Sequence, residues 1–366
     1  MNKVLILGGY GNFGKRIARL LTRQNIAVII SGRDANKAKI LVQALPDGLA
    51  EMAVFDVRQT LATRLSELAP TVVINTCGPF QTSDYAVAET CIEHGVHYID
   101  LADGRDFVTN IPVLDGRAKR NNVAVISGAS TVPGLSSAVI EHFRPQFSEI
   151  VSLDFGIAPG QRAERGLATT QAILGYVGKK LRRCAGYETR YGWQDLHSQK
   201  YPEIGNRLMA NCDIPDLDLL PEKYGISKIR FSAGMENPVV HLGIWTLSWL
   251  VRSGLPIDLT KHSTALLAFS NWFDLLGSAD GGMHMILEGK NRAGRQTTIK
   301  WFVVALDGDG PYIPTVPAVV LARKIVTGQF GATGAMRCVG LVSLEEYLHE
   351  LKDFKVKTYE SVATTA

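Results

Sequence analysis

The sequence predicts an α/β fold, in which a doubly wound parallel sheet precedes an α+β second domain with a mixed, largely antiparallel sheet. Three observations lead to this prediction. Short apolar runs alternate with segments of helical periodicity as far as residue 127. A glycine-rich turn separates the first apolar run from the first helical segment. Beyond residue 149 the apolar runs lengthen and resemble antiparallel strands, with helical segments between them.

The first strand is expected at residues 4–7, and apolar residues at helical spacing over 15–21 begin a helix. Gly9, Gly11 and Gly14 between them fit G-x-G-x-x-G, and Gly8, Gly11 and Gly14 fit the looser G-x-x-G-x-x-G. Such glycines permit a tight turn, backbone approach to a pyrophosphate and close helix–strand packing. The helix start then faces the diphosphate. We therefore expect a Rossmann-type dinucleotide site at Gly8, Gly9, Tyr10, Gly11, Asn12, Phe13 and Gly14.

The second strand, at residues 27–30, ends in Ser31, Gly32, Arg33 and Asp34. In dinucleotide-binding folds an acidic residue at this tip favours NAD, whereas a small polar residue with an arginine accommodates a 2′-phosphate. Ser31 occupies the tip and Arg33 supplies a planar cation. The pattern therefore favours NADP(H), with Ser31, Gly32 and Arg33 as binding residues. Asp34 has an alternative role as the cap of the next helix.

The remaining elements of the first domain follow the same alternation. Residues 51–57 form the third strand, and Asp56 and Val57 at its end are expected beside the adenine. The alternative for Asp56 is to cap the helix at 58–68. We then expect strands at 71–77, 96–101 and 123–127, and helices at 84–94 and 113–121.

The second domain is expected to contain strands at 150–158, 227–235, 284–290 and 296–306, with helices at 239–251 and 266–276. Helices at 316–326 and 344–354 end the chain. We assign residues 1–130 to the dinucleotide-binding domain, completed by 311–366, and residues 131–310 to a substrate and dimerisation domain.

The composition of the 366 residues excludes several classes of protein. A net charge of +4 without a long basic run gives no reason to expect a nucleic-acid partner. The five cysteines are scattered and contain no C-x-x-C, which argues against a disulfide framework and a metal site and fits a reducing compartment. We see no signal peptide and expect a cytoplasmic protein. Membrane association is not expected, although Trp245, Trp249 and Trp272 leave an interfacial patch as an alternative to a core or dimer contact.

Residues 74–80 (INTCGPF) and 91–100 (CIEHGVHYID) resemble the saccharopine dehydrogenase-like family of NADP-binding proteins. Residues 277–283 and 309–314 resemble a bacterial branch of that family. The resemblance implies a Rossmann domain, a homodimer formed through the second domain, and pyridine-nucleotide chemistry on carbon–nitrogen bonds. By resemblance and position, Thr76, Cys77, Gly78, Pro79 and Phe80 are expected along the ribose and nicotinamide of the cofactor.

Two departures from that family affect the expected substrate. Saccharopine-forming reductases have Leu-Asp-Pro-Gly after the sixth strand, whereas this chain has Thr131-Val132-Pro133-Gly134. They also place a cysteine on the following strand, and residues 151–158 contain none. We therefore do not expect saccharopine itself to be the substrate.

Parallel sheets bind ligands at the carboxyl ends of their strands, which directs attention to the loops around Cys77 and Asp103. Asp103 is the best candidate for a catalytic acid or base, and its alternative is a structural cap or ion-pair partner. Cys77 is a second catalytic candidate, although buried cysteines are mostly inert. Phe80 has the alternative of lying in the core.

The second domain offers further candidates. Arg162 and Arg165 are suited to clamping a carboxylate-bearing small molecule, although an exposed loop also favours arginine. His241 and His284 lie on apolar segments, where a core histidine is the more frequent arrangement. The leading hypothesis is an NADP(H)-dependent oxidoreductase acting on an imine, amino-acid or keto substrate. The alternative is an NADP(H)-binding sensor or scaffold without catalytic turnover.

Overall fold

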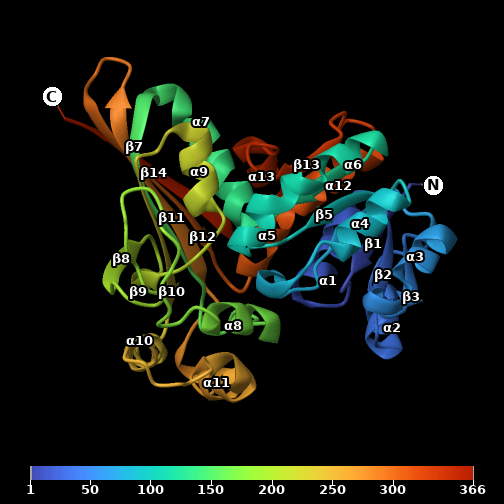
Figure 1. Cartoon of the computed structure of the whole chain (residues 1–366), viewed down its shortest axis with the longest axis horizontal. Coiled ribbons are helices and arrows are strands. Elements are labelled where there is room, and N and C mark those ends of the chain that lie inside the picture. The colour runs from blue at the N-terminus through green and yellow to red at the C-terminus, as the bar shows by residue number, and fades with distance from the viewer. Residues whose placement is uncertain (1, 366) are drawn as a thin grey trace. The chain divides into compact units, whose positions relative to one another are not determined.

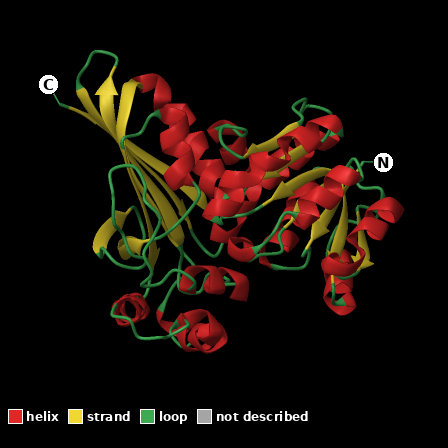
Figure 2. Ribbon diagram, viewed as in Figure 1, coloured by secondary structure: helices red, strands yellow, loops and turns green. Residues whose placement is uncertain are grey.

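The computed structural model describes residues 2–365 and divides into two compact units (Figure 1). The first unit comprises the chain up to Ala138 together with Tyr312–Glu350. The second comprises Val139–Pro311 and the chain from Leu351 onward. Each unit is built on its own sheet, as the strands in Figure 2 show.

The sheet of the first unit contains, within the described residues, seven parallel strands in the order β13-β6-β5-β4-β1-β2-β3. Its strands are β1 (Lys3–Leu7), β2 (Ala27–Gly32), β3 (Ala50–Val54), β4 (Val72–Asn75), β5 (His97–Asp100), β6 (Ala124–Ser127) and β13 (Gly334–Arg337). Helices α1 (Asn12–Arg23) and α12 (Val316–Val326) pack on one another and on the sheet. The other helices are α2 (Ala35–Gln43), α3 (Val57–Leu68), α4 (Ala86–Glu93), α5 (Arg105–Asn110), α6 (Asp115–Arg120) and α13 (Leu344–Glu350), while α7 (Ser136–Phe143) spans the boundary with the second unit.

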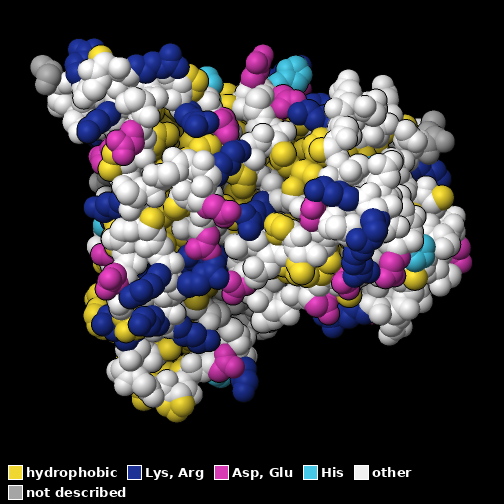
Figure 3. Space-filling model, turned by 45° about the horizontal axis from the view of Figure 1, so that its top comes forward, with side chains coloured by type: hydrophobic (Ala, Val, Ile, Leu, Met, Phe, Trp, Pro, Cys, Tyr) yellow, Lys and Arg dark blue, Asp and Glu magenta, His cyan; other side chains and the backbone are white. Residues whose placement is uncertain are grey.

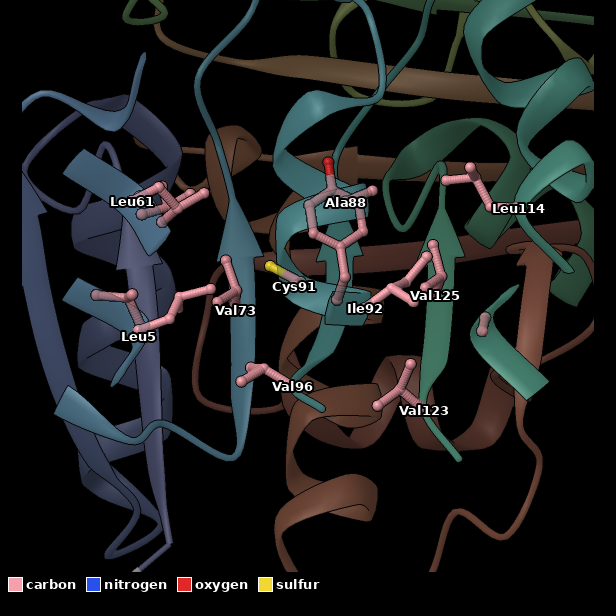
Figure 4. Packing of buried hydrophobic residues seen from close by; sticks show 14 of the residues in the cluster. Leu5, Leu61, Val73, Ala88, Cys91, Ile92, Val96, Leu114, Val123 and Val125 are labelled. Atoms are coloured by element: carbon pink, nitrogen blue, oxygen red, sulfur yellow. The ribbon is translucent and has the colours of Figure 1, made fainter. Parts of the chain in front are cut away.

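Continuous apolar runs form these strands because both faces of a parallel sheet are covered. On one face, Leu5 of β1, Val73 of β4 and Val125 of β6 meet Ile92 of α4 in a fully buried cluster (Figure 4). On the other face, Val4 and Ile6 are equally inaccessible to solvent. The six predicted strands are confirmed. The seventh, β13, was not predicted, and the helix expected at 113–121 is divided between the 3-10 turn Ile111–Leu114 and α6.

The sheet of the second unit contains, among the described residues, seven strands in the order β14-β12-β11-β7-β10-β9-β8. They are β7 (Phe147–Ala158), β8 (His197–Tyr201), β9 (Gly205–Asn211), β10 (Lys228–Met235), β11 (Gly281–Asn291), β12 (Gln296–Ala305) and β14 (Val356–Thr364). The pair β7–β10 is parallel and the other pairs are antiparallel. The predicted fold class, a doubly wound parallel sheet with a mixed and largely antiparallel second sheet, is confirmed.

The helices of the second unit are α8 (Leu167–Leu174), α9 (Asp216–Tyr224), α10 (Pro238–Arg252) and α11 (Ser263–Asn271). The predicted helix at 266–276 is α11 followed by the 3-10 turn Asp274–Leu276. Strands β8, β9 and β14 were not predicted. None of the helices within residues 2–365 is long and apolar enough to cross a membrane.

The two units divide the chain differently from the domains expected from the sequence. The expected return of residues 311–366 to the first domain applies only as far as Glu350. Strand β14 instead pairs with β12 from Val356 to Thr364, where it hydrogen-bonds the edge that β12 presents. Val356–Thr364 therefore completes the second sheet.

Candidate functional site

The carboxyl ends of the parallel strands form one edge of the first sheet, and the chain changes direction there between β1 and β4. From β1 it continues to β2 on one side, while β4 lies on the other side and continues to β5. Open α/β sheets bind ligands at this kind of switch point, because the loops leaving the two strands diverge. The loops beginning at Gly8 and Thr76 are those that leave β1 and β4.

The turn after β1 shows why glycines occupy its positions. Gly8 has a φ of +72°, in the left-handed region, and accepts a hydrogen bond of 2.8 Å from the amide of Gly11. A Cβ at Gly14 would lie 2.4 Å from the carbonyl oxygen of Gly8 and 2.7 Å from the Cα of Gly9. Helix α1 therefore packs against the turn as closely as its backbone allows, which directs the positive end of its dipole into the turn.

The start of α1 carries no competing negative charge. Gly11 is its N-cap and supplies no side-chain cap, and the first turn contains no acidic residue. A helix start of this kind favours an anion through its amide groups and its dipole. The predicted residues Gly8 to Gly14 thus form an arrangement suited to a pyrophosphate.

The tip of β2 is shaped by Tyr10. Its hydroxyl accepts a hydrogen bond of 2.9 Å from the amide of Asp34, and its ring covers Gly32, where a Cβ would approach within 2.3 Å. Asp34 accepts a hydrogen bond from the amide of Lys37 and so caps α2, which is the alternative role considered for it from the sequence. Ser31 is fully buried, and its hydroxyl makes no hydrogen bond to a described residue. Arg33 beside it is exposed.

The loop after β4 lies directly on the turn after β1. Thr76 Oγ1 donates to the carbonyl oxygen of Leu7 at 2.8 Å, and a Cβ at Gly8 would lie 2.8 Å from that hydroxyl. Arg33 and Asp56 are both close enough to act electrostatically on the thiol of Cys77. The ends of β2, β3 and β4 therefore converge on one region, although Asp56 also caps α3 by accepting from the amide of Arg58.

Two candidate residues of the loops after β4 and β5 have environments that bear on their chemistry. Although Cys77 is an exposed residue, desolvation of its thiol raises the pKa to about 11, so it stays protonated at neutral pH. This disfavours Cys77 as a nucleophile. Asp103 accepts a hydrogen bond of 3.0 Å from Gln81, and desolvation raises the pKa of its carboxyl group, as suits a general acid.

Of the other predicted cofactor residues, Phe80 is buried, with its ring centroid 5.3 Å from that of Phe107. Phe80 therefore lies in the core, which was the alternative to contact with the cofactor. Val57 begins α3, directly after the capping Asp56. Gly78 and Pro79 lie in the loop between β4 and the 3-10 turn Phe80–Thr82.

Sequence reasoning missed Asp100 at the end of β5. This fully buried carboxylate accepts hydrogen bonds of 2.9 Å from the amides of Ala102 and Gly128 and from the hydroxyl of Ser127. Burial raises the pKa of Asp100 to about 6. By joining the loops after β5 and β6, Asp100 positions the segment that carries Asp103. The sequence signal that could have identified Asp100 is an acidic residue at the end of a buried strand.

Most of the candidate functional side chains of the second unit make structural contacts. Arg165 forms an ion pair of 2.6 Å with Asp274, whereas Arg162 is exposed. His284 is buried with Nδ1 2.8 Å from the hydroxyl of Tyr201, and His241 is buried beside Trp193. Burial lowers the pKa of each histidine to about 4, so both are neutral at pH 7. These are core histidines. Within residues 2–365, no three His, Cys, Asp or Glu side chains are placed to hold a metal ion together.

Comparison with known proteins supports the reading of the first unit. Residues 4–129 match the family model described as the saccharopine dehydrogenase NADP binding domain. The sequence resemblance is therefore confirmed over this segment, which is an NAD(P)-binding domain. A search of curated proteins found no match to the chain.

Two solved structures illustrate the similarity of fold. Saccharopine dehydrogenase (L-Glu forming) from Saccharomyces cerevisiae superposes with a TM-score of 0.64 at 12% sequence identity, over 99% of this chain and 100% of that one. An amine dehydrogenase from Mycobacterium smegmatis gives a TM-score of 0.47 at 11% identity, over 92% of this chain and 95% of that one. At such identity, the yeast structure establishes a shared fold and nothing finer.

Proposed function

We propose, from the membership of residues 4–129 in the saccharopine dehydrogenase NADP-binding domain family, that this chain is an NADP(H)-dependent oxidoreductase. The observation that carries the proposal is the glycine turn at the β1–β4 switch point, with Arg33 at the tip of the neighbouring strand. Arg33 replaces the acid that would favour NAD, and its guanidinium is suited to a 2′-phosphate. At the same tip, the buried hydroxyl of Ser31 makes no hydrogen bond to a described residue and can therefore bond the nucleotide.

The residues present fit a dinucleotide, and each has a separate part in holding it. The amide groups at the start of α1 bind the pyrophosphate, and Arg33 binds the 2′-phosphate. The loop Thr76–Pro79, which hydrogen-bonds the end of β1 through Thr76, lines the ribose and nicotinamide. When bound, the nicotinamide supplies or accepts a hydride. We assign to Asp103 the exchange of the proton that accompanies the hydride, since desolvation raises the pKa of its carboxyl group.

For the substrate we propose an imine, amino-acid or keto compound that bears a carboxylate, other than saccharopine. The yeast enzyme whose fold this chain shares is a saccharopine dehydrogenase. Val132 stands where saccharopine-forming enzymes have an acid, so the carboxylate that those enzymes carry at this position is missing here, which supports a substrate other than saccharopine. In the second unit Arg162 remains exposed as a candidate carboxylate ligand. We also propose that the protein acts in the cytoplasm as a homodimer, as the family resemblance implies.

Calorimetric titration of the full chain with NADPH and NADH tests the cofactor assignment. We expect NADPH to bind more tightly, and Arg33→Ala to weaken NADPH alone by roughly 10- to 100-fold, the usual value of a charge-assisted hydrogen bond. Arg64→Ala is the matched control, because Arg64 is a partly exposed arginine on α3 that is paired with Glu67. The NADP assignment is wrong if the wild type binds NADPH and NADH with equal affinity and Arg33→Ala changes neither affinity.

The second candidate is a sensor that binds NADP(H) without turnover. The replacement of the family's acid by Val132 and the absence of a cysteine from residues 151–158 favour it. Consumption of NADPH, followed by its absorbance over a panel of imino and keto acids, separates the two functions. Tight binding without consumption of NADPH by any member of the panel would support the sensor.

A further inference from the structure

Helix α10 is apolar on both of its faces. Ile244, Leu247 and Val251 face inward and pack on a buried cluster that includes Trp193 and Leu259. Val239, Leu242 and Trp249 recur at helical spacing on the outward face, with 59, 40 and 45% of their surfaces exposed. A helix that is apolar all round is ordinarily buried in a large core or placed against lipid. The fold of the second unit therefore leaves the outward apolar side chains of α10 uncovered.

Helix α11 and the turn after it expose still larger side chains. Trp272 is 77% exposed, Leu275 95% and Leu276 78%, and Phe269 packs beside Trp272 at 5.9 Å between ring centroids. Both α10 and α11 pack on the same core cluster, and they lie at the same end of the second unit (Figure 1). We define the α10–α11 face as Val239, Leu242, Trp249, Leu250, Leu255, Phe269, Trp272, Leu275 and Leu276.

Cations flank this face on the side of α10. Gly178 touches the helix so closely that a Cβ there would lie 2.3 Å from the carbonyl oxygen of Ser248. The exposed Lys179 and Lys180 follow directly. Arg252 at the end of α10 places its guanidinium 4.9 Å from the ring centroid of Trp249. Figure 3 shows Lys and Arg side chains gathered beside hydrophobic ones on the surface of the second unit.

The acidic side chain nearest the protruding leucines is neutralised by its neighbours. Asp274 lies between Trp272 and Leu275 in the sequence, yet its carboxylate bonds Arg165 at 2.6 Å and the side chain of Gln161 at 3.0 Å. Hydrogen bonds from Thr260 are the main cause that lowers the pKa of the Asp258 carboxyl group, and Lys261 and Lys179 also lie near enough to lower it. The face therefore combines tryptophan and leucine side chains with an excess of accessible cations on one flank.

We propose that the α10–α11 face docks on the surface of an anionic lipid bilayer. Exposed tryptophan and leucine side chains enter the boundary between headgroups and acyl chains, and basic residues at the edge are attracted to anionic headgroups. The indole of Trp249 and the guanidinium of Arg252 suit the interfacial depth at which aromatic and cationic groups gather. This inference goes beyond the proposed redox function and does not depend on it.

Flotation of the full chain with vesicles tests the proposal, using phosphatidylcholine alone and phosphatidylcholine mixed with phosphatidylglycerol. We expect the protein to float with the mixed vesicles. The triple variant Trp272→Ser, Leu275→Ser, Leu276→Ser should bind roughly tenfold less or weaker still, because most of the inserted apolar area is lost. Lys179→Ala with Lys180→Ala should weaken binding to the mixed vesicles by about tenfold and reduce its salt dependence.

The matched control is Ile40→Ser with Val113→Ser, which removes apolar side chains that are 67 and 72% exposed in the first unit. This variant should float as the wild type does. Circular dichroism and NADPH titration of every variant check that the fold persists. Failure of the wild type to float with either vesicle, or flotation unaffected by the triple variant, overturns the proposal. The proposal is also overturned if the wild type does not float, is a dimer in light scattering, and is dissociated by the triple substitution. That result would assign the face to a second copy of the chain.

Discussion

Replacing Gly14 by alanine tests the close packing of α1 on the glycine turn. The added methyl group would lie 2.4 Å from the carbonyl oxygen of Gly8 and 2.7 Å from the Cα of Gly9, and both neighbours are backbone atoms. Because backbone cannot rotate away as a side chain can, either the turn or the helix has to move. Overpacking of this kind costs roughly 1–3 kcal/mol. Alanine's better helix propensity offsets about 1 kcal/mol of that cost.

We therefore expect Gly14→Ala to lower the free energy of unfolding of the first unit by up to about 2 kcal/mol, as measured by urea denaturation. NADPH binding should weaken by roughly tenfold or more, since the amide groups that meet the pyrophosphate shift with the turn. Gly116→Ala is the matched control in α6, where the new methyl group meets only the flexible end of Arg120 at 3.5 Å. That variant should be as stable as the wild type or more so by about 0.5–1 kcal/mol. A Gly14→Ala protein with unchanged stability and unchanged NADPH affinity would refute the reasoning.

Three further predictions concern single side chains of the first unit. The raised pKa of Asp100, about 6 in the folded chain, means that the native state takes up a proton before the unfolded state does. The contribution of Asp100 to the free energy of unfolding therefore rises by at most about 3 kcal/mol as the pH falls from 7 to 4. Asp100→Asn should remove this rise from denaturation curves measured across the same pH range. No difference in pH dependence between the two proteins would contradict it. Cys77 should react slowly with iodoacetamide at pH 7 and faster as the pH approaches 11, as followed by peptide mass mapping, and rapid alkylation at neutral pH would show that its thiol is not desolvated. Asp103→Asn should lower kcat by about 100-fold or more while NADPH affinity in calorimetry stays unchanged, and an unchanged kcat would exclude it as the proton donor.

Much of the first unit could be predicted from local sequence. Residues 4–7, the three glycines and the helical spacing that follows them identify strand, turn and helix without reference to any other part of the chain. The alternation continues to Ser127 because the central strands of a parallel sheet are buried on both faces and therefore read as continuous apolar runs, whereas the edge strand β3 is largely exposed. The family resemblance at residues 74–80 and 91–100 rests on the same local information.

Other features depend on partners that are distant in the sequence. Strand β14 contains mostly polar and charged residues and becomes a strand because β12 presents an edge to it. Asp34 and Asp56 were each compatible with two roles, and hydrogen bonds to the amides of Lys37 and Arg58 show the capping role. The buried Asp100 acquires its function only when the ends of β5 and β6 come together.

By itself, then, the sequence determined the fold class and the glycine turn, because short-range periodicity and turn chemistry encode them. Only the tertiary structure decided which apolar residues are covered. The outward and inward faces of α10 are equally apolar in the sequence, yet Val251 packs in a core and Trp249 meets solvent. Burial is a property of the neighbours that folding brings, and periodicity within one helix carries no information about them.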